Sequence, residues 1–96
     1  MSEMLVSSSN LKQYFFYVPV WILQEKDVKH SEALVFSLIL NDCENTGKCV
    51  MTNREIGQII NFKKGTVGNL ISHLAKLRFI KVNVVSGFER TITVLV

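Results

Sequence analysis

The sequence predicts a single α+β domain in which three helices build the core and a β-hairpin follows them. Three observations support this prediction: the chain has 96 residues, its hydrophobic fraction is 48%, and its apolar pattern changes from helical to strand spacing toward the C-terminus. A small domain buries a smaller share of its surface than a large one, so a homodimer would add stability. We expect a flexible tail at residues 1–11 and the domain at residues 12–96.

The first part of the domain is expected to hold an additional strand and a short helix. Tyr14–Val18 is rich in aromatic side chains and predicts a strand. Pro19 follows and suits the first position of a short helical turn over residues 20–23, because its fixed φ is compatible with a helix start. A polar link then covers Gln24–His30.

The first core helix is predicted from Ser31, a favourable N-cap residue, to about Asp42. Its residues are apolar on nearly every side, which is typical of a helix at the centre of a core. Asn, Asp and Gly are frequent in Asn41–Gly47, which predicts a loop. Lys48–Met51 is too short for a helix and predicts a small strand.

The clearest local pattern is a capping box at the start of the second core helix. Thr52 and Glu55 have the spacing at which each side chain bonds the backbone amide of the other residue. The helix that follows is predicted over residues 53–60 and is broken at Asn61 and Phe62. A third helix is predicted over Lys64–Arg78, where apolar residues spaced three and four apart form one stripe: Val67, Leu70, Ile71, Leu74 and Leu77.

The C-terminal part alternates between apolar and polar residues, as a hairpin with one buried face does. Ile80–Val84 and Arg90–Val94 are the two predicted strands, and Ser86–Glu89 is the predicted turn between them. Because the hairpin directly follows the third core helix, we expect it to form a flap beside that helix.

The charge is distributed unevenly along the chain. Residues 1–51 carry four lysines against six acidic residues, whereas residues 52–96 carry seven lysines and arginines against two glutamates. A basic half joined to an acidic half indicates one face directed at a polyanion such as nucleic acid. The alternative is an ordinary solvated basic face.

The sequence offers little for catalysis, metal binding or membrane insertion. Five residues separate Cys43 from Cys49 and there is no second ligand pair, so we expect reduced thiols and no zinc, with a local disulfide as the alternative. There is no glycine-rich phosphate loop, no helical histidine pair and no nucleophile elbow, so we expect neither an enzyme nor a cofactor. The longest apolar run, Phe15–Leu23, contains Pro19 and is too short for a membrane span. With no signal peptide visible, we expect a cytoplasmic protein.

Two segments of the chain resemble a known family. Thr52–Ile80 resembles the winged helix-turn-helix of bacterial regulators and replication proteins, and Val18–Trp21 followed by Ser31–Phe36 resembles the N-terminal domain of plasmid and phage replication initiators. The resemblance implies an α+β winged helix, with the hairpin as the wing. It also implies sequence-specific binding of double-stranded DNA in replication, conjugation, partition or transcription, together with other proteins of a nucleoprotein complex.

The resemblance also implies which residues contact DNA. In the family, the second helix of the motif reads bases, which places four residues at the major groove: Lys64, Thr66, Asn69 and His73. Contacts to the DNA backbone would come from Thr52, Asn53, Arg54, Lys63 and Lys76. Contacts from the hairpin would come from Lys81, Asn83, Ser86 and Arg90.

Three positions depart from the family pattern. Gly65 and Gly68 stand where the family usually has polar or basic residues, which removes two potential base contacts, and Arg78 stands where it favours glycine. The glycines suggest either that the hairpin and the termini read much of the DNA or that another element, such as a helix of a second subunit, approaches closely. A winged helix used for protein–protein contact is therefore the alternative function.

Overall fold

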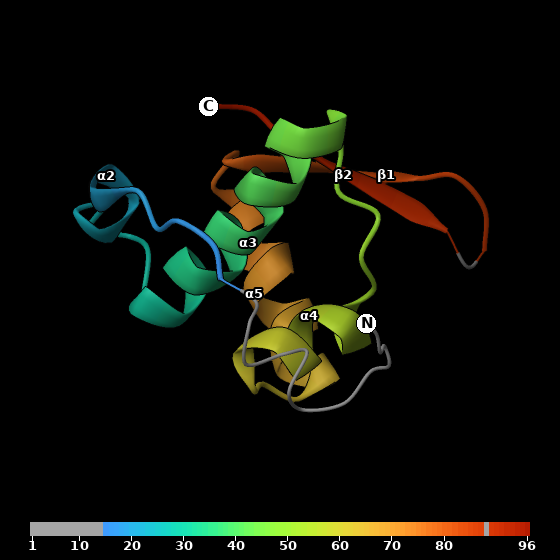
Figure 1. Ribbon diagram of the computed structural model, residues 1–96, viewed down its shortest axis with the longest axis horizontal. Helices are drawn as coiled ribbons and strands as arrows, with labels where there is room; N and C mark the ends of the chain where they lie inside the picture. The colour runs from blue at the N-terminus through green and yellow to red at the C-terminus, as the bar shows by residue number, and fades with distance from the viewer. Residues whose placement is uncertain (1–14, 88) are drawn as a thin grey trace.

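The computed structural model describes residues 15–87 and 89–96, and these form four helices and one two-stranded antiparallel sheet (Figure 1). The helices are α2 (Val20–Leu23), α3 (His30–Thr46), α4 (Asn53–Ile60) and α5 (Lys64–Lys76), and the strands are β1 (Ile80–Val84) and β2 (Arg90–Val94). The tail predicted at residues 1–11 lies outside the described residues. The predicted α+β class is confirmed at this level.

The aromatic segment before α2 is extended, but it is not a strand. Tyr17 pairs with a side chain of α3 instead of a neighbouring strand: its N–H donates to Asn41 Oδ1 (3.2 Å) and its carbonyl accepts from Asn41 Nδ2 (2.9 Å). The prediction of a strand over Tyr14–Val18 is therefore wrong for residues 15–18, and Tyr14 lies outside the described residues. The short helix over residues 20–23 is confirmed, with Pro19 as its N-cap residue.

Helix α3 is longer at both ends than the sequence predicts. It begins at His30, with Lys29 as its N-cap, so the expectation that Ser31 caps the helix is wrong. It continues to Thr46, so residues 41–46 of the predicted loop are helical. Gly47 ends the helix in the left-handed conformation (φ 87°), where its N–H donates to the Cys43 carbonyl.

Helix α3 lies at the centre of the core, as its apolar composition predicts. Its buried residues include Val35, Phe36, Leu38 and Ile39. The stripe on α5 packs against it through its buried members, Val67, Ile71 and Leu74, and α4 contributes Ile56. The hairpin closes the core through Ile80 and Ile92.

The capping box that opens α4 is confirmed. The Glu55 amide donates to Thr52 Oγ1 (3.1 Å), and the Thr52 amide donates to Glu55 Oε1 (2.9 Å). Helix α4 ends at Asn61 in the left-handed conformation (φ 62°), and the Phe62 amide donates back to the Gly57 carbonyl (2.9 Å). The break predicted at Asn61 and Phe62 is therefore a tight helix terminus that redirects the chain into α5.

Helix α5 ends two residues before the predicted limit. Its last helical residue is Lys76, and Arg78 adopts a left-handed conformation (φ 67°). This backbone conformation is uncommon for residues other than glycine. It gives a physical reason for the glycine that the resembled family favours at this position.

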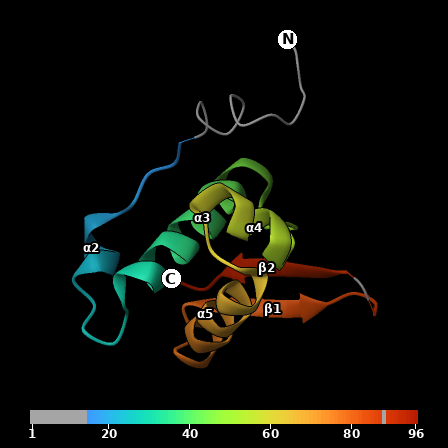
Figure 2. The ribbon, with the colours of Figure 1, turned by 90° about the horizontal axis from the view of Figure 1, so that it is seen from below.

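The hairpin has the predicted strands. β1 and β2 pair antiparallel with Ile80 opposite Val94 and Val84 opposite Arg90, and the hairpin extends beyond the helical body (Figures 1 and 2). The strand predicted over Lys48–Met51 is reduced to one bridge, in which Cys49 pairs with Ile92 on the free edge of β2. None of the described helices is both long enough and apolar enough to cross a membrane.

Candidate functional site

A surface groove of about 770 Å³ lies between the hairpin and the starts of α4 and α5. One wall is the segment that connects α3 to α4, and the other is the outer half of the hairpin. The two walls are both visible to the right of the helical body in Figure 1. The capping box positions the first wall, because it determines where α4 begins, and Arg54 lies in the first turn of this helix.

Four cationic side chains from four parts of the chain line this groove. They are Lys48 from the connecting segment, Arg54 from α4, Lys64 from α5 and Arg90 from β2; Glu89 is the one acidic residue in the lining. In the same lining, Val50, Val84 and Val85 add exposed apolar surface. The groove therefore presents both positive charge and apolar surface to solvent.

Lys48 is a lining residue that the sequence reasoning missed. It belongs to the half of the chain in which acidic residues outnumber basic ones. The bridge between Cys49 and Ile92 brings it next to the hairpin. The charges of Lys48 and Arg90 line the same groove because these two segments, which are far apart in the sequence, pair with each other.

Arg90 connects the two walls of the groove. Its guanidinium donates to the Met51 carbonyl, with 3.1 Å between the nitrogen and the oxygen, just before the cap of α4. Burial lowers the pKa of Arg90 from its usual value, while the nearby Cys49 acts in the opposite direction. A guanidinium stays charged under these conditions and has five N–H donors. Arg90 therefore holds the hairpin in place and retains donors for a ligand.

The outward face of α5 continues from the groove. Thr66, Asn69 and Lys76 are exposed, as the sequence predicts for residues that contact a ligand. Gly65 is also exposed, and a Cβ added there would meet nothing within 4 Å. This face therefore carries few side chains, of which Asn69 is the most versatile hydrogen-bonding group.

Gly68 has a role within the chain itself. A Cβ added to it would lie 3.1 Å from Asn53 Nδ2, so its small size lets the start of α4 approach α5 closely. Asn53 is half-buried at this contact, and among the described residues its Oδ1 has no hydrogen-bond partner. The close approach suggested by the glycine is therefore made at this position by α4 of the same chain.

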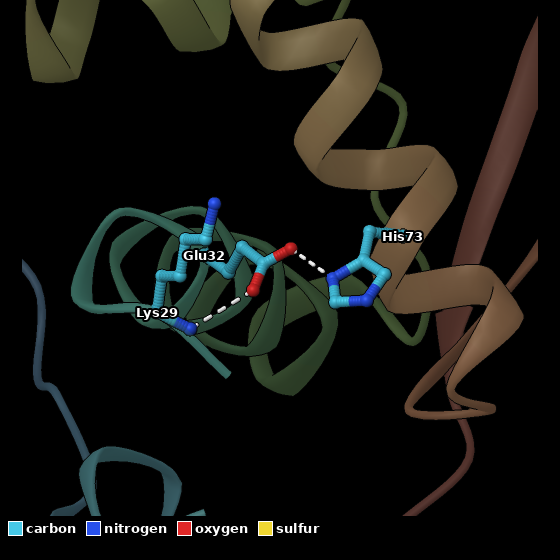
Figure 3. A network of polar contacts seen from close by, with 3 residues as sticks. All are labelled: Lys29, Glu32 and His73. Carbon is cyan, nitrogen blue, oxygen red and sulfur yellow. Dashed lines mark hydrogen bonds and ion pairs between the residues drawn. The ribbon is translucent and has the colours of Figure 1, made fainter. Parts of the chain in front are cut away.

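His73 is directed at α3. Its Nδ1 is hydrogen-bonded to Oε2 of Glu32, a carboxylate that is only 2% exposed, and Glu32 Oε1 accepts from the Lys29 amide at 2.9 Å (Figure 3). The His73 side chain remains 42% exposed. The structure thus gives His73 a partner in the helix-to-helix contact, one turn after Asn69 on the same side of α5.

Replacing Glu32 is expected to destabilise the domain. Glu32→Ala removes the acceptor for the Lys29 amide and leaves His73 without its partner, which should lower the free energy of unfolding by about 1–3 kcal/mol. Glu32→Gln is the matched control, because glutamine completes a capping box as glutamate does and should retain part of this stability. Urea unfolding measures both variants, and equal stability of Glu32→Ala and the wild type would contradict the assigned role.

The remaining predicted site residues divide into two groups. Thr52, Asn53, Arg54, Lys64, Ser86 and Arg90 line the groove together. The others lie outside its lining: Lys63, Thr66, Asn69, His73 and Lys76 at the start or on the surface of α5, and Lys81 and Asn83 on β1. Arg54 and Lys64 also line a second, shallower depression of about 450 Å³ beside the turn between α4 and α5.

The two cysteines are free thiols next to β2. Cys43 Sγ contacts the Ile92 carbonyl at 3.4 Å, and Cys49 is fully buried. Burial raises the pKa of Cys49 to about 12 and also raises the pKa of Cys43. Both thiols are therefore protonated and weakly nucleophilic at neutral pH.

No protein-family model, curated protein or solved structure matches this chain. Its function therefore has to be inferred from the chemistry of the described surface. That surface consists of the cationic groove, the outward face of α5 and the hairpin that borders them.

Proposed function

We propose that this protein is a winged helix-turn-helix protein that binds double-stranded DNA in a sequence-specific manner, with no catalytic activity of its own. In this proposal α4 and α5 form the helix-turn-helix and the hairpin is the wing. The proposal rests on one observation above all: Lys48, Arg54, Lys64 and Arg90 converge on one groove from four parts of the chain. A second support is the resemblance of residues 52–80 to the winged-helix family.

In the proposed complex, α5 lies in the major groove of DNA, which is about 12 Å wide and admits a helix. Asn69 is exposed and would bond an adenine through its side-chain oxygen as acceptor and its NH2 group as donor, and Lys64 and Thr66 would reach neighbouring bases. Lys63 and Lys76 lie at the two ends of the same helix, where they contact phosphates.

The cationic groove takes the sugar–phosphate backbone beside the major groove. Phosphates pair with the lysines and arginines of the groove, and deoxyribose rings pack against its valines. Backbone amides at the starts of α4 and α5 add further donors for phosphate. On β1, Lys81 and Asn83 extend the contact along the hairpin.

Backbone contacts are expected to supply most of the affinity. The base-reading face is sparse, because Gly65 has no side chain and His73 is bonded to Glu32. Phosphate contacts from lysine and arginine are independent of sequence and strongly dependent on salt. We accordingly expect moderate discrimination between DNA sequences and substantial binding to random duplexes.

Such a protein would serve plasmid or phage DNA replication, conjugation, partition or transcription, as part of a nucleoprotein complex. The alternative, a winged helix that only contacts proteins, was suggested by the two glycines of α5. Gly68 is now explained by its contact with Asn53. The cationic groove favours DNA as the partner.

Binding of a fluorescent random-sequence duplex is expected to fall steeply with salt. Displacement of counterions should reduce the association constant by about a thousandfold or more between 50 and 200 mM salt if six or more phosphates are contacted. Fluorescence anisotropy at several salt concentrations measures the slope, and selection from a random pool then tests for a preferred sequence. Binding that does not change with salt, or no binding at low salt, would overturn the proposal.

A further inference from the structure

Among the described residues, Glu32 is the one charged side chain that is buried. Each of its carboxylate oxygens has a partner of its own: Oε1 accepts from the Lys29 amide at 2.9 Å, and Oε2 is bonded to His73 Nδ1 (Figure 3). The first bond belongs to the cap of α3. The second bond reaches across to α5 and adds nothing to that cap, so it needs an explanation of its own.

The bond to Glu32 determines which nitrogen of the His73 ring carries the proton. An ionised carboxylate accepts hydrogen bonds and donates none. The nitrogen that meets Oε2 is therefore protonated, which fixes the neutral ring as the Nδ1–H tautomer. The other ring nitrogen, Nε2, is then an acceptor with a free lone pair, and it has no hydrogen-bond partner among the described residues.

This free nitrogen lies on the side of α5 that carries Asn69. His73 follows Asn69 by four residues, about one turn, so the two side chains share one side of the helix. The His73 side chain is 42% exposed although its Nδ1 is bonded to a buried atom, and Nε2 is turned away from the carboxylate (Figure 3). Because the ring is held in one orientation before a ligand arrives, less side-chain freedom is lost on binding.

We infer that Glu32 is a positioning residue for base recognition, which holds His73 so that Nε2 accepts a hydrogen bond from the exocyclic amino group of adenine or cytosine. This inference rests on the proposed function, because it assigns a role within the contact between α5 and the major groove. Adenine N6 and cytosine N4 are donors in that groove, whereas guanine and thymine present acceptors. His73 lies about 6 Å beyond Asn69 along the helix, so its base is roughly one or two base pairs from the base that Asn69 contacts.

Glu32→Gln should reverse the hydrogen-bonding role of Nε2. The glutamine oxygen accepts from the Lys29 amide, as Oε1 does, so its NH2 group faces His73 Nδ1. Nδ1 must then accept, the ring proton moves to Nε2, and the outward nitrogen becomes a donor. The preferred base should change from adenine or cytosine to guanine or thymine, with about 3- to 10-fold discrimination, the size of one hydrogen bond. A Glu32 that only stabilises the fold would leave the base preference unchanged.

His73→Asn is the matched control. The asparagine NH2 group takes a position close to that of Nδ1 and keeps a donor for Glu32, but nothing replaces Nε2 on the outward side. This variant should bind DNA without a preference at the base pair assigned to His73. Its preference at the base pair assigned to Asn69 should remain that of the wild type.

Fluorescence anisotropy with duplex DNA tests the base preference at low salt and about pH 8.5, where histidine is ordinarily neutral. A duplex selected from a random pool by the wild type is made with each of the four bases at every position, and the three proteins are titrated with this set. The inference is overturned if His73→Asn changes no position, if the wild type prefers guanine or thymine there, or if Glu32→Gln keeps the wild-type preference. These outcomes leave the proposed function standing, whereas a wild type that binds no duplex overturns both.

Nitrogen-15 NMR of the histidine rings tests the tautomer without DNA. The chain has two histidines, so His30→Gln leaves His73 as the one remaining ring, and His30 is exposed. At about pH 8.5 the proton should be on Nδ1 in the presence of Glu32 and on Nε2 when Glu32→Gln is added. A ring that is protonated on Nε2 beside the wild-type Glu32 overturns the inference.

Discussion

Gly57→Ala is expected to destabilise the domain by at least about 2–3 kcal/mol, the upper range for forcing additional volume into a packed site. A Cβ at position 57 would lie 2.3 Å from the Phe62 carbonyl oxygen and 3.3 Å from its carbon. These are backbone atoms of the turn in which Asn61 is left-handed and the Phe62 amide bonds the Gly57 carbonyl. Relief of the clash therefore requires the turn between α4 and α5 to open.

Gly65→Ala is the matched control for this prediction. A Cβ at position 65 meets nothing within 4 Å, and alanine favours a helix more than glycine does. It should stabilise the domain by about 0.5–1 kcal/mol. Urea unfolding of the two variants beside the wild type measures both effects. Equal stability of Gly57→Ala and the wild type would show that the turn accommodates a side chain, which contradicts the close approach described here.

Reversing the charge of both Arg54 and Lys64, by substituting glutamate for each, is expected to weaken duplex DNA binding by about a hundredfold at moderate salt. Both side chains are exposed and line the groove, and both also border the second depression. Each loss of a phosphate contact should lower the slope of the logarithm of affinity against the logarithm of salt concentration by about 1. Fluorescence anisotropy of Arg54→Glu, Lys64→Glu and the double variant measures the affinity and the slope.

Both substitutions should leave the fold intact, so a loss of binding would not be caused by unfolding. Arg54 lies in the first turn of α4 and Lys64 in the first turn of α5, where a carboxylate stabilises a helix. Lys26→Glu makes the same charge change at an exposed position in the loop that follows α2, and it should leave DNA binding nearly unchanged. If Lys26→Glu weakens binding as much as Arg54→Glu does, the attraction comes from net charge and the groove has no special role.

About half of the contact residues predicted from the sequence lie in the lining of the groove. Thr52, Asn53, Arg54, Lys64, Ser86 and Arg90 were predicted and line the groove together. They were found because each lies at a recognisable place, the start of a helix or a part of a hairpin. Lys48 was missed, because its sequence neighbours give no reason to place it beside β2.

The sequence by itself determined the elements whose hydrogen bonds and apolar contacts link residues a few positions apart. The capping box of Thr52 and Glu55 joins residues three apart, the stripe of α5 repeats every three to four residues, and the hairpin alternates with a period of two. Such patterns are sufficient because the partner of each group is a near neighbour in the chain.

The tertiary structure alone decided where polar groups found distant partners. Asn41 bonds Tyr17, 24 residues away, which replaces a strand with an extended segment and lets α3 continue through a predicted loop. His73 bonds Glu32, 41 residues away, a contact with α3 that its neighbours in the sequence do not predict. Local patterns do not encode such contacts, because they depend on which surfaces meet when the core closes.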